Sequence, residues 1–237
     1  LELRLAAFGE AHPETAYSYF GSARVLQFTG RCSEAIPIFE RAESIFSAFY
    51  GKPTIIEIQA SQDRGGCLLE LGRLAEAEEI FERAMAWYVK ERGEDHLMTA
   101  FLQRDIARLW LARKEPERAR APIDNALATF AREHSEDHPD YAETLATQGR
   151  MLAQNEQFEE AEAVFEKALR VIREKLGDTN ARQLAALEGL AAVYALTGRP
   201  AQARQAYERT LKIYDAHYGE DHALSQPAER AHAQLAQ

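Results

Sequence analysis

The sequence predicts an all-α protein, a solenoid of antiparallel helix pairs, and three observations support this fold class. Alanine recurs at a spacing of 42 residues, at Ala35, Ala77, Ala119, Ala161 and Ala203. Each interval contains two stretches in which apolar residues follow the period of an amphipathic helix. Glycine and proline lie largely between these stretches, and no strand-like alternation competes with the helical pattern. A repeat of this size indicates units that pack on their neighbours.

The repeat period divides the chain into five full units with a partial unit at each end. Residues 1–10 are predicted to be the end of a preceding repeat helix. The full repeats are predicted at 11–52, 53–95, 96–137, 138–179 and 180–221. Residues 222–237 are predicted to form a capping helix or a truncated sixth repeat. Because the chain begins with Leu and in the phase of a second helix, we interpret it as a fragment of a longer protein.

The unit 138–179 shows the order of elements within a repeat. Helical spacing runs through 141–152 and again through 161–176, and the short polar segment NEQFEE between them requires the two helices to run antiparallel. Pro139 suits a first helical position, and Gly177 suits a left-handed residue that closes the second helix. Positions equivalent to Gly177 hold Gly9, Gly51, Gly93, Ser135 and Gly219. The helix-cap position holds His12, Thr54, His96, His138, Asn180 and His222.

Small and large residues also recur with this period. The first helix has a small residue at Ala23, Gly65, Ala107, Gly149 and Ala191. The second helix has a large one at Phe39, Phe81, Ile123, Phe165 and Tyr207. Small residues against large ones predict interdigitated packing within each pair. The third repeat departs from the pattern, since Lys114 replaces a turn glycine and Pro122 is expected to kink or delay the second helix.

Composition argues against several classes of protein. A net charge of −10 and a pI near 5.3 disfavour a nucleic-acid-binding surface, which needs a basic face. No apolar run approaches the roughly 18 residues of a membrane-spanning helix, and no signal peptide pattern begins the chain. Cys32 and Cys67 fall in different repeats and form no CxxC motif, so we expect buried or idle thiols in a reducing cytoplasmic setting.

The sequence also offers few candidates for a catalytic or metal-binding site. The sequence contains no Ser/His/Asp order, no Walker loop and no GxGxxG motif. His134 and His138 have a spacing found in zinc sites, but a helix end lies between them and His138 occupies the cap position, so the two rings need not share a face. We therefore expect no enzymatic activity, no cofactor and no metal.

The segments GRMLAQNEQFEEAEAVFEKAL and GCLLELGRLAEAEEIFERAM resemble the tetratricopeptide repeat (TPR). The usual period of that family is about 34 residues. The longer unit here, with its punctuation at Gly93 to His96 and Gly219 to His222, is similar to the kinesin light chain variety. The resemblance implies a right-handed superhelix whose concave face is lined by first helices and accommodates a peptide or partner segment.

The resemblance also implies which residues face this groove. They are Tyr17, Phe20, Arg24, Gln59, Gln62, Asp63, Phe101, Arg104, Arg108, Glu143 and Arg150. Arg24, Arg108 and Arg150 share one repeat position, and guanidinium groups suit the carboxylates of an acidic or C-terminal peptide. The alternative is that these arginines pair locally with Asp63, Asp105 or Glu143. A clamp for a terminal carboxylate is disfavoured because the groove lacks the asparagines of such clamps, so an internal acidic segment with an aromatic anchor is preferred.

The sequence thus indicates a non-enzymatic scaffold for protein association that binds a partner peptide, with no nucleic acid or membrane as partner. A second hypothesis is that the array is the regulatory or sensor arm of a larger ATPase, protease or transcription factor, whose effector domain lies outside this fragment.

Overall fold

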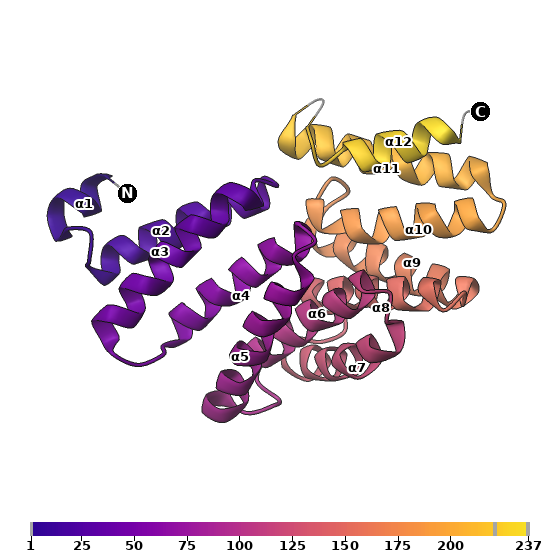
Figure 1. The fold of residues 1–237 in the computed structure, drawn as a ribbon. Helices are drawn as coiled ribbons and strands as arrows, with labels where there is room; N and C mark the ends of the chain where they lie inside the picture. The colour runs from indigo at the N-terminus through magenta and orange to yellow at the C-terminus, as the bar shows by residue number, and fades with distance from the viewer. Residues whose placement is uncertain (1, 220–221, 236–237) are drawn as a thin grey trace. The chain divides into compact units, whose positions relative to one another are not determined.

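The computed structural model describes residues 2–219 and 222–235 (Figure 1). Helix accounts for 82% of the structure, and the described residues contain no strand, so the predicted all-α class is confirmed. The elements are α1 (Glu2–Phe8), α2 (Pro13–Phe28), α3 (Cys32–Tyr50), α4 (Ile55–Glu70), α5 (Leu74–Arg92), α6 (Leu97–Ala112), α7 (Pro116–Glu133), α8 (Pro139–Gln154), α9 (Phe158–Leu176), the 3-10 helix η1 (Ala181–Gln183), α10 (Leu184–Leu196), α11 (Pro200–Tyr218) and α12 (Gln226–Gln234).

The helices form antiparallel pairs within two compact units, Leu1–Glu94 and Asp95–Gln237, which we call the N-terminal and C-terminal units. In the N-terminal unit α2 pairs with α3 and α4 with α5. In the C-terminal unit the pairs are α6 with α7, α8 with α9 and α10 with α11, and α12 packs on α11. Within the C-terminal unit the first helices α6, α8 and α10 also contact one another in succession, so their side chains share one surface.

The predicted repeats end partly outside the described residues. Residues 220–221 of the repeat predicted at 180–221, residues 236–237 of the terminal segment, and residue 1 are not described. The described part of the terminal segment contains α12. None of the described helices combines the length and the apolar character needed to cross a membrane.

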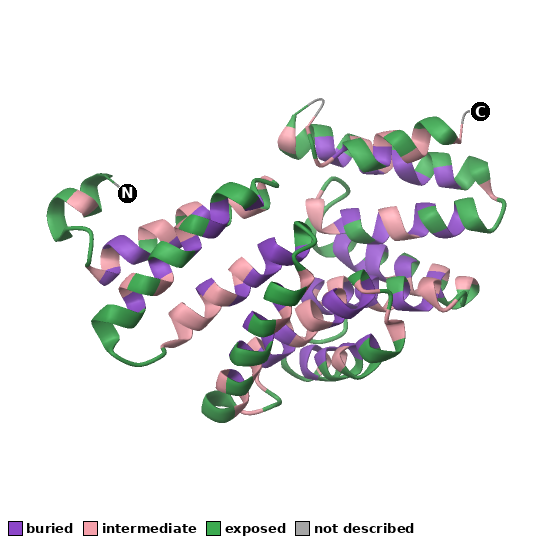
Figure 2. Cartoon of the chain, in the orientation of Figure 1, coloured by how far each residue is buried: buried purple, intermediate pink, exposed green. Residues whose placement is uncertain are grey.

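The recurring alanines lie at the centre of the core, as their spacing predicts. All five, from Ala35 to Ala203, are 0% exposed. The paired helices α2 to α11 contain both buried and exposed residues (Figure 2), whereas α1 has no buried residue. A Cβ added to Gly65 would lie 2.6 Å from the ring of Phe81, and one added to Gly149 would lie 2.7 Å from the ring of Phe165. The predicted packing of small first-helix residues against large second-helix residues is therefore confirmed.

The cap position also behaves as its residue types predict. Nδ1 of each cap histidine accepts a hydrogen bond from the backbone N–H two residues later, over 3.1–3.2 Å, at His12, His96, His138 and His222. Oδ1 of Asn180 accepts the equivalent bond over 3.0 Å, and Oγ1 of Thr54 accepts one from Glu57 over 3.4 Å. These side chains satisfy backbone donors that a helix start leaves free.

Two details of the sequence-based picture need correction. The delay expected from Pro122 is wrong, because α7 begins at Pro116, where a proline is well tolerated, and continues through Pro122 to Glu133. Cys32 and Cys67 are buried as predicted, but they also interact with each other where α3 packs on α4. Spacing along the chain gave no indication of this contact, because it forms between successive repeats.

Candidate functional site

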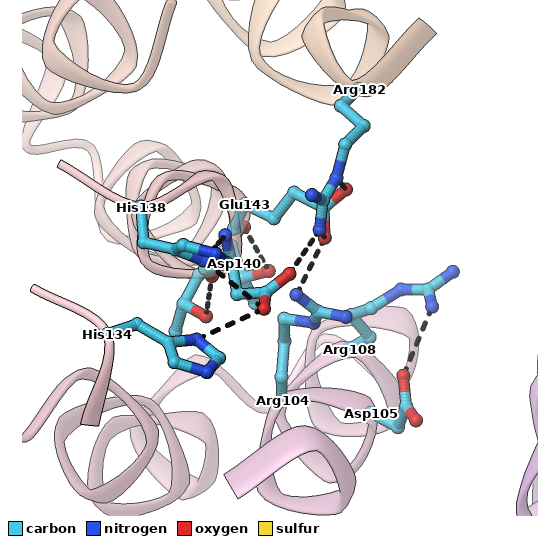
Figure 3. Close-up of polar contacts among 10 residues, drawn as sticks. Arg104, Asp105, Arg108, His134, His138, Asp140, Glu143 and Arg182 are labelled. Carbon is cyan, nitrogen blue, oxygen red and sulfur yellow. Dashed lines mark hydrogen bonds and ion pairs between the residues drawn. The ribbon is translucent and has the colours of Figure 1, made fainter. Parts of the chain in front are cut away.

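Charged residues gather on the first-helix surface of the C-terminal unit (Figure 3). Arg104 on α6 donates from Nη1 to Oε2 of Glu143 on α8 over 2.7 Å. Arg182 on η1 donates from Nε to Oε1 of Glu143 over 2.5 Å and also bonds Oδ1 of Asp140. These bonds join three successive repeats through α6, α8 and η1.

The contacts in this cluster shift the pKa values of Glu143 and Arg182. Burial alone would raise the pKa of Glu143, but the charge of Arg104 and the hydrogen bond from Arg182 outweigh it and hold this pKa below its usual range. Burial likewise opposes the charge of Arg182, whereas Glu143 and Asp140 raise the pKa of its guanidinium. The charged form of Glu143 is therefore favoured, and both Glu143 and Asp140 already accept hydrogen bonds from arginines.

His134 and His138 border the same cluster. The two ring centroids are 4.2 Å apart, and Nδ1 of each ring lies within 3.4 Å of Oδ2 of Asp140. The sequence suggested that the helix end between the two histidines need not leave their rings on one face. In the structure the short turn from α7 to α8 brings the two rings together. His134, His138 and Asp140 are the described residues whose arrangement could hold a metal ion.

Arg150 on α8 has a different environment. No hydrogen bond or ion pair joins it to another residue of the described chain, although Arg108 and Glu188 act on its charge. Its side chain is exposed to solvent, yet surrounding protein and the like charge of Arg108 lower the pKa of its guanidinium. Arg150 lines a cavity on this surface.

A cavity of about 190 Å³ lies beside Arg150. It is lined by Arg150, Ala153, Gln154, Phe165, Glu188, Gly189 and Ala192. Glu188 accepts a hydrogen bond of 2.8 Å from Oη of Tyr214, while burial raises the pKa of its carboxyl group above the usual range. The cavity thus combines an apolar lining with one cationic and one acidic group.

The arginines predicted to face a groove are mostly paired with nearby acids. Besides the Arg104–Glu143 bond, Arg108 bonds Asp105 over 3.3 Å on the same helix. Phe101 is half-buried against Phe130 and lies beneath the Arg104 guanidinium. The local-pairing alternative therefore describes Arg104 and Arg108, while Arg150 departs from it.

In the N-terminal unit the predicted residues are divided between surface and core. Arg24 lies 3.4 Å from the Asp63 carboxylate and over the ring of Phe20. Phe20 is buried. Tyr17 is 40% exposed, with its ring edge-on to Phe46. Two glutamines complete the predicted set, Gln59 and Gln62.

Gln59 is half-buried, whereas Gln62 is buried and accepts a hydrogen bond from Oη of Tyr88 over 3.3 Å. Phe20 and Gln62 thus belong to the packing of their helix pairs, because their positions on α2 and α4 turn toward the second helices. The sequence-based set also omitted Asp140, Arg182 and Glu188. One signal was available, since Asp140 and Arg182 occupy the same position in successive repeats and carry opposite charges.

The packed helix pairs, the histidine caps and the shared first-helix surface define a helical repeat protein of the kind used for association with other proteins. A tetratricopeptide repeat family model matches residues 57–123, 111–171 and 147–216, which together cover more than half of the chain. The chain belongs to the tetratricopeptide repeat family. No curated protein matches it.

Several solved structures share the fold. The nearly identical TPR-like repeats of a protein described as a kinesin light chain from Podosopora anserina are 22% identical, with a TM-score of 0.62, over 86% of this chain and 97% of that one. BtubC (BKLC) from P. vanneervenii is 22% identical, with a TM-score of 0.61, over 87% and 91% of the two chains. A Rap protein complexed with Competence and Sporulation Factor is 17% identical, with a TM-score of 0.74, over 93% of this chain and 62% of that one. The resemblance to kinesin light chain repeats is confirmed at the level of fold.

Proposed function

We propose that the chain is a non-enzymatic scaffold that binds an acidic segment of a partner protein on the first-helix surface of its C-terminal unit. The tetratricopeptide fold is generally an interaction scaffold, which supports the general part of this proposal. The Rap protein of similar fold was crystallised with Competence and Sporulation Factor, which supports binding of a second molecule by such an array. The observation that carries the specific part is the state of Arg150.

Arg150 offers a guanidinium that makes no hydrogen bond or ion pair with a described residue, and the like charge of Arg108 acts on it. A carboxylate placed between them would relieve their repulsion and accept charge-assisted hydrogen bonds from either one. Among the neighbouring carboxylates, Glu143 is held by Arg104 and Arg182, whereas Asp105 bonds Arg108 and would have to share it. Glu188 also acts on the charge of Arg150, but its carboxyl group already accepts a hydrogen bond from Tyr214, and burial raises its pKa.

The cavity beside Arg150 supplies the apolar part of the proposed site. Its lining includes Phe165, Gly189 and Ala192, and its volume of about 190 Å³ suits a single large apolar side chain. An acidic residue on Arg150 with an apolar or aromatic neighbour in this cavity would fulfil the preference for an internal acidic segment with an aromatic anchor. In the N-terminal unit, Tyr17, Arg24 and Asp63 remain candidates for further contacts with a partner.

The experiment begins with a pull-down by the intact chain and mapping of the bound partner segment on peptide arrays. The mapped peptide is then titrated against the wild type and against Arg108→Glu and Arg150→Glu. Arg170→Glu is the matched control, because Arg170 is exposed on the second helix α9. Each charge-assisted hydrogen bond contributes roughly 1.5–3 kcal/mol, so we expect at least tenfold weaker binding for the two groove variants and no change for the control.

Two results would contradict the proposal. Unchanged affinity of both groove variants would remove the first-helix surface as the binding site. Turnover by the chain in a broad screen of hydrolase substrates would contradict the non-enzymatic part. We also propose a cytoplasmic location, since the free thiols of Cys32 and Cys67 suit a reducing compartment.

A further inference from the structure

Three side chains that commonly bind metals converge where α7 ends and α8 begins (Figure 3). His134 is the residue that follows α7, His138 precedes α8, and Asp140 lies in the first turn of α8. Each offers one ligand atom, and these atoms all lie within 4.8 Å of one another. Two imidazoles and a carboxylate form a ligand set that zinc and related ions favour.

The spacing of the ligand atoms fits a tetrahedral ion. Oδ2 of Asp140 lies 3.4 Å from Nδ1 of His134 and 3.3 Å from Nδ1 of His138. A tetrahedral zinc ion with bonds of roughly 2.0–2.1 Å places its ligands roughly 3.3–3.4 Å apart. The two separations from Asp140 match such an ion, and all three ligand atoms lie within 4.8 Å of one another.

The ring nitrogen of His134 supplies a second, independent observation. Its Nδ1 atom is buried and makes no hydrogen bond, although Oδ2 of Asp140 lies 3.4 Å away. Buried polar atoms are almost always satisfied in folded proteins, so such an atom calls for an explanation. A metal ion between Nδ1 and the carboxylate would satisfy both.

The helix cap formed by His138 does not require the side chain of His134 or of Asp140. His96 makes the same cap as His138, yet the residues equivalent to His134 and Asp140 in its repeat are Arg92 and Met98. The caps at His12 and His222 are likewise formed without a second histidine and an aspartate at those positions. His134 and Asp140 are thus additions to a cap that functions without them.

The surroundings also orient the carboxylate. Arg182 bonds Oδ1 of Asp140, which leaves Oδ2 directed at the histidines. Such outer contacts fix the orientation of metal ligands in known sites. The start of α8 and the charge of Arg182 disfavour a cation, whereas the end of α7 and the carboxyl group of Asp140 favour one. Two imidazoles and one carboxylate suit a transition metal ion better than Mg²⁺ or Ca²⁺, which prefer sites made of oxygen ligands.

We propose that His134, His138 and Asp140 bind a divalent transition metal ion of the zinc class, with water at the remaining position. The ion would fasten the end of α7 to the start of α8 and so join two successive helix pairs of the C-terminal unit. Coordination through Nδ1 of His138 would replace its hydrogen bond from the Asp140 amide, and coordination through Nε2 would keep that bond. The site does not depend on the partner surface around Arg150.

The test uses the whole chain, freed of metal by a chelator and then titrated with Zn²⁺ and with Co²⁺. We expect one ion per chain, visible absorption bands from tetrahedral Co²⁺, and a higher melting temperature with Zn²⁺. Mg²⁺ should have no effect at the same concentration. Binding that shows no saturation at one equivalent, or no Co²⁺ bands, would overturn the proposal.

Variants distinguish this site from other zinc ligands on the chain. His138→Asn removes one ligand and keeps a cap, since Asn180 caps the equivalent position. We expect His138→Asn and His134→Ala to weaken Zn²⁺ binding at least tenfold, while circular dichroism confirms that both fold. His96→Asn is the matched control and should bind like the wild type. Undiminished binding by His138→Asn and His134→Ala would place the ion elsewhere and overturn the assignment.

Discussion

The ring of Phe165 lies between two glycines, and this arrangement gives a sharp prediction for Gly189→Ala. Phe165 on α9 is 0% exposed and packs against Gly149 of its own pair and Gly189 of the next first helix. A Cβ on Gly189 would lie 2.2, 2.5 and 2.9 Å from three atoms of the ring. Separations this short require the ring of Phe165 or the backbone of α10 to move.

The expected magnitude follows from two opposing effects. Overpacking of a filled core costs about 1–3 kcal/mol, and the shortness of these contacts favours the upper end of that range. Replacing a helical glycine by alanine recovers up to about 1 kcal/mol of helix propensity. We therefore expect Gly189→Ala to lower the free energy of unfolding by about 2 kcal/mol. For a chain of this length that loss corresponds to a melting temperature about 4–8 °C lower.

Gly21→Ala is the matched control in the measurement, which uses urea and thermal unfolding followed by circular dichroism. Gly21 lies inside α2, and a Cβ added to it would meet nothing within 4 Å. It should raise stability by about 0.5–1 kcal/mol. Combining Gly189→Ala with Phe165→Leu should recover part of the loss in a double-mutant cycle. Equal stabilisation by Gly189→Ala and Gly21→Ala would refute the close contact.

Further predictions concern the core, the charged cluster and the thiols. Phe165→Ala should cost about 3–5 kcal/mol and Ala161→Leu about 1–3 kcal/mol, and unchanged melting temperatures would contradict their burial. Glu143→Gln should destabilise the chain at neutral pH. Because the folded-state pKa of Glu143 is lowered, its stabilisation is present above the unfolded pKa and is lost as pH falls through the folded pKa, so the two stabilities should converge in acid. Contact with Cys67 and burial raise the pKa of the Cys32 thiol, so iodoacetamide should label Cys32 slowly at pH 8 and rapidly in urea.

The core could be predicted from sequence because its signals are local and periodic. The spacing of Ala35 and its equivalents reports positions that every repeat buries in the same way. The cap histidines could be predicted for the same reason, since each bonds a backbone N–H two residues away. Repetition gave each of these inferences several independent examples.

The charged cluster could not be predicted in the same way. The bonds of Glu143 to Arg104 and Arg182 each span 39 residues, so they depend on how neighbouring first helices align. The contact between Cys32 and Cys67 also crosses from one repeat to the next. Periodicity specifies which face of a helix is buried, but it does not specify which polar side chains on adjacent exposed faces will meet.

The turns between first and second helices share one backbone conformation but differ in the residue that adopts it. Gly30, Gly72 and Gly198 take a positive φ there, and Lys114 and Glu156 take the same conformation with φ of 64° and 61°. A side chain in this left-handed region costs roughly 1–2 kcal/mol, so glycine at either position would make the turn easier to form. At this one position the chain therefore presents a cation on one hairpin loop and an anion on the next, where Gly30, Gly72 and Gly198 have no side chain. An engineered array that restored glycine at both loops would gain stability and lose that chemical distinction between neighbouring repeats.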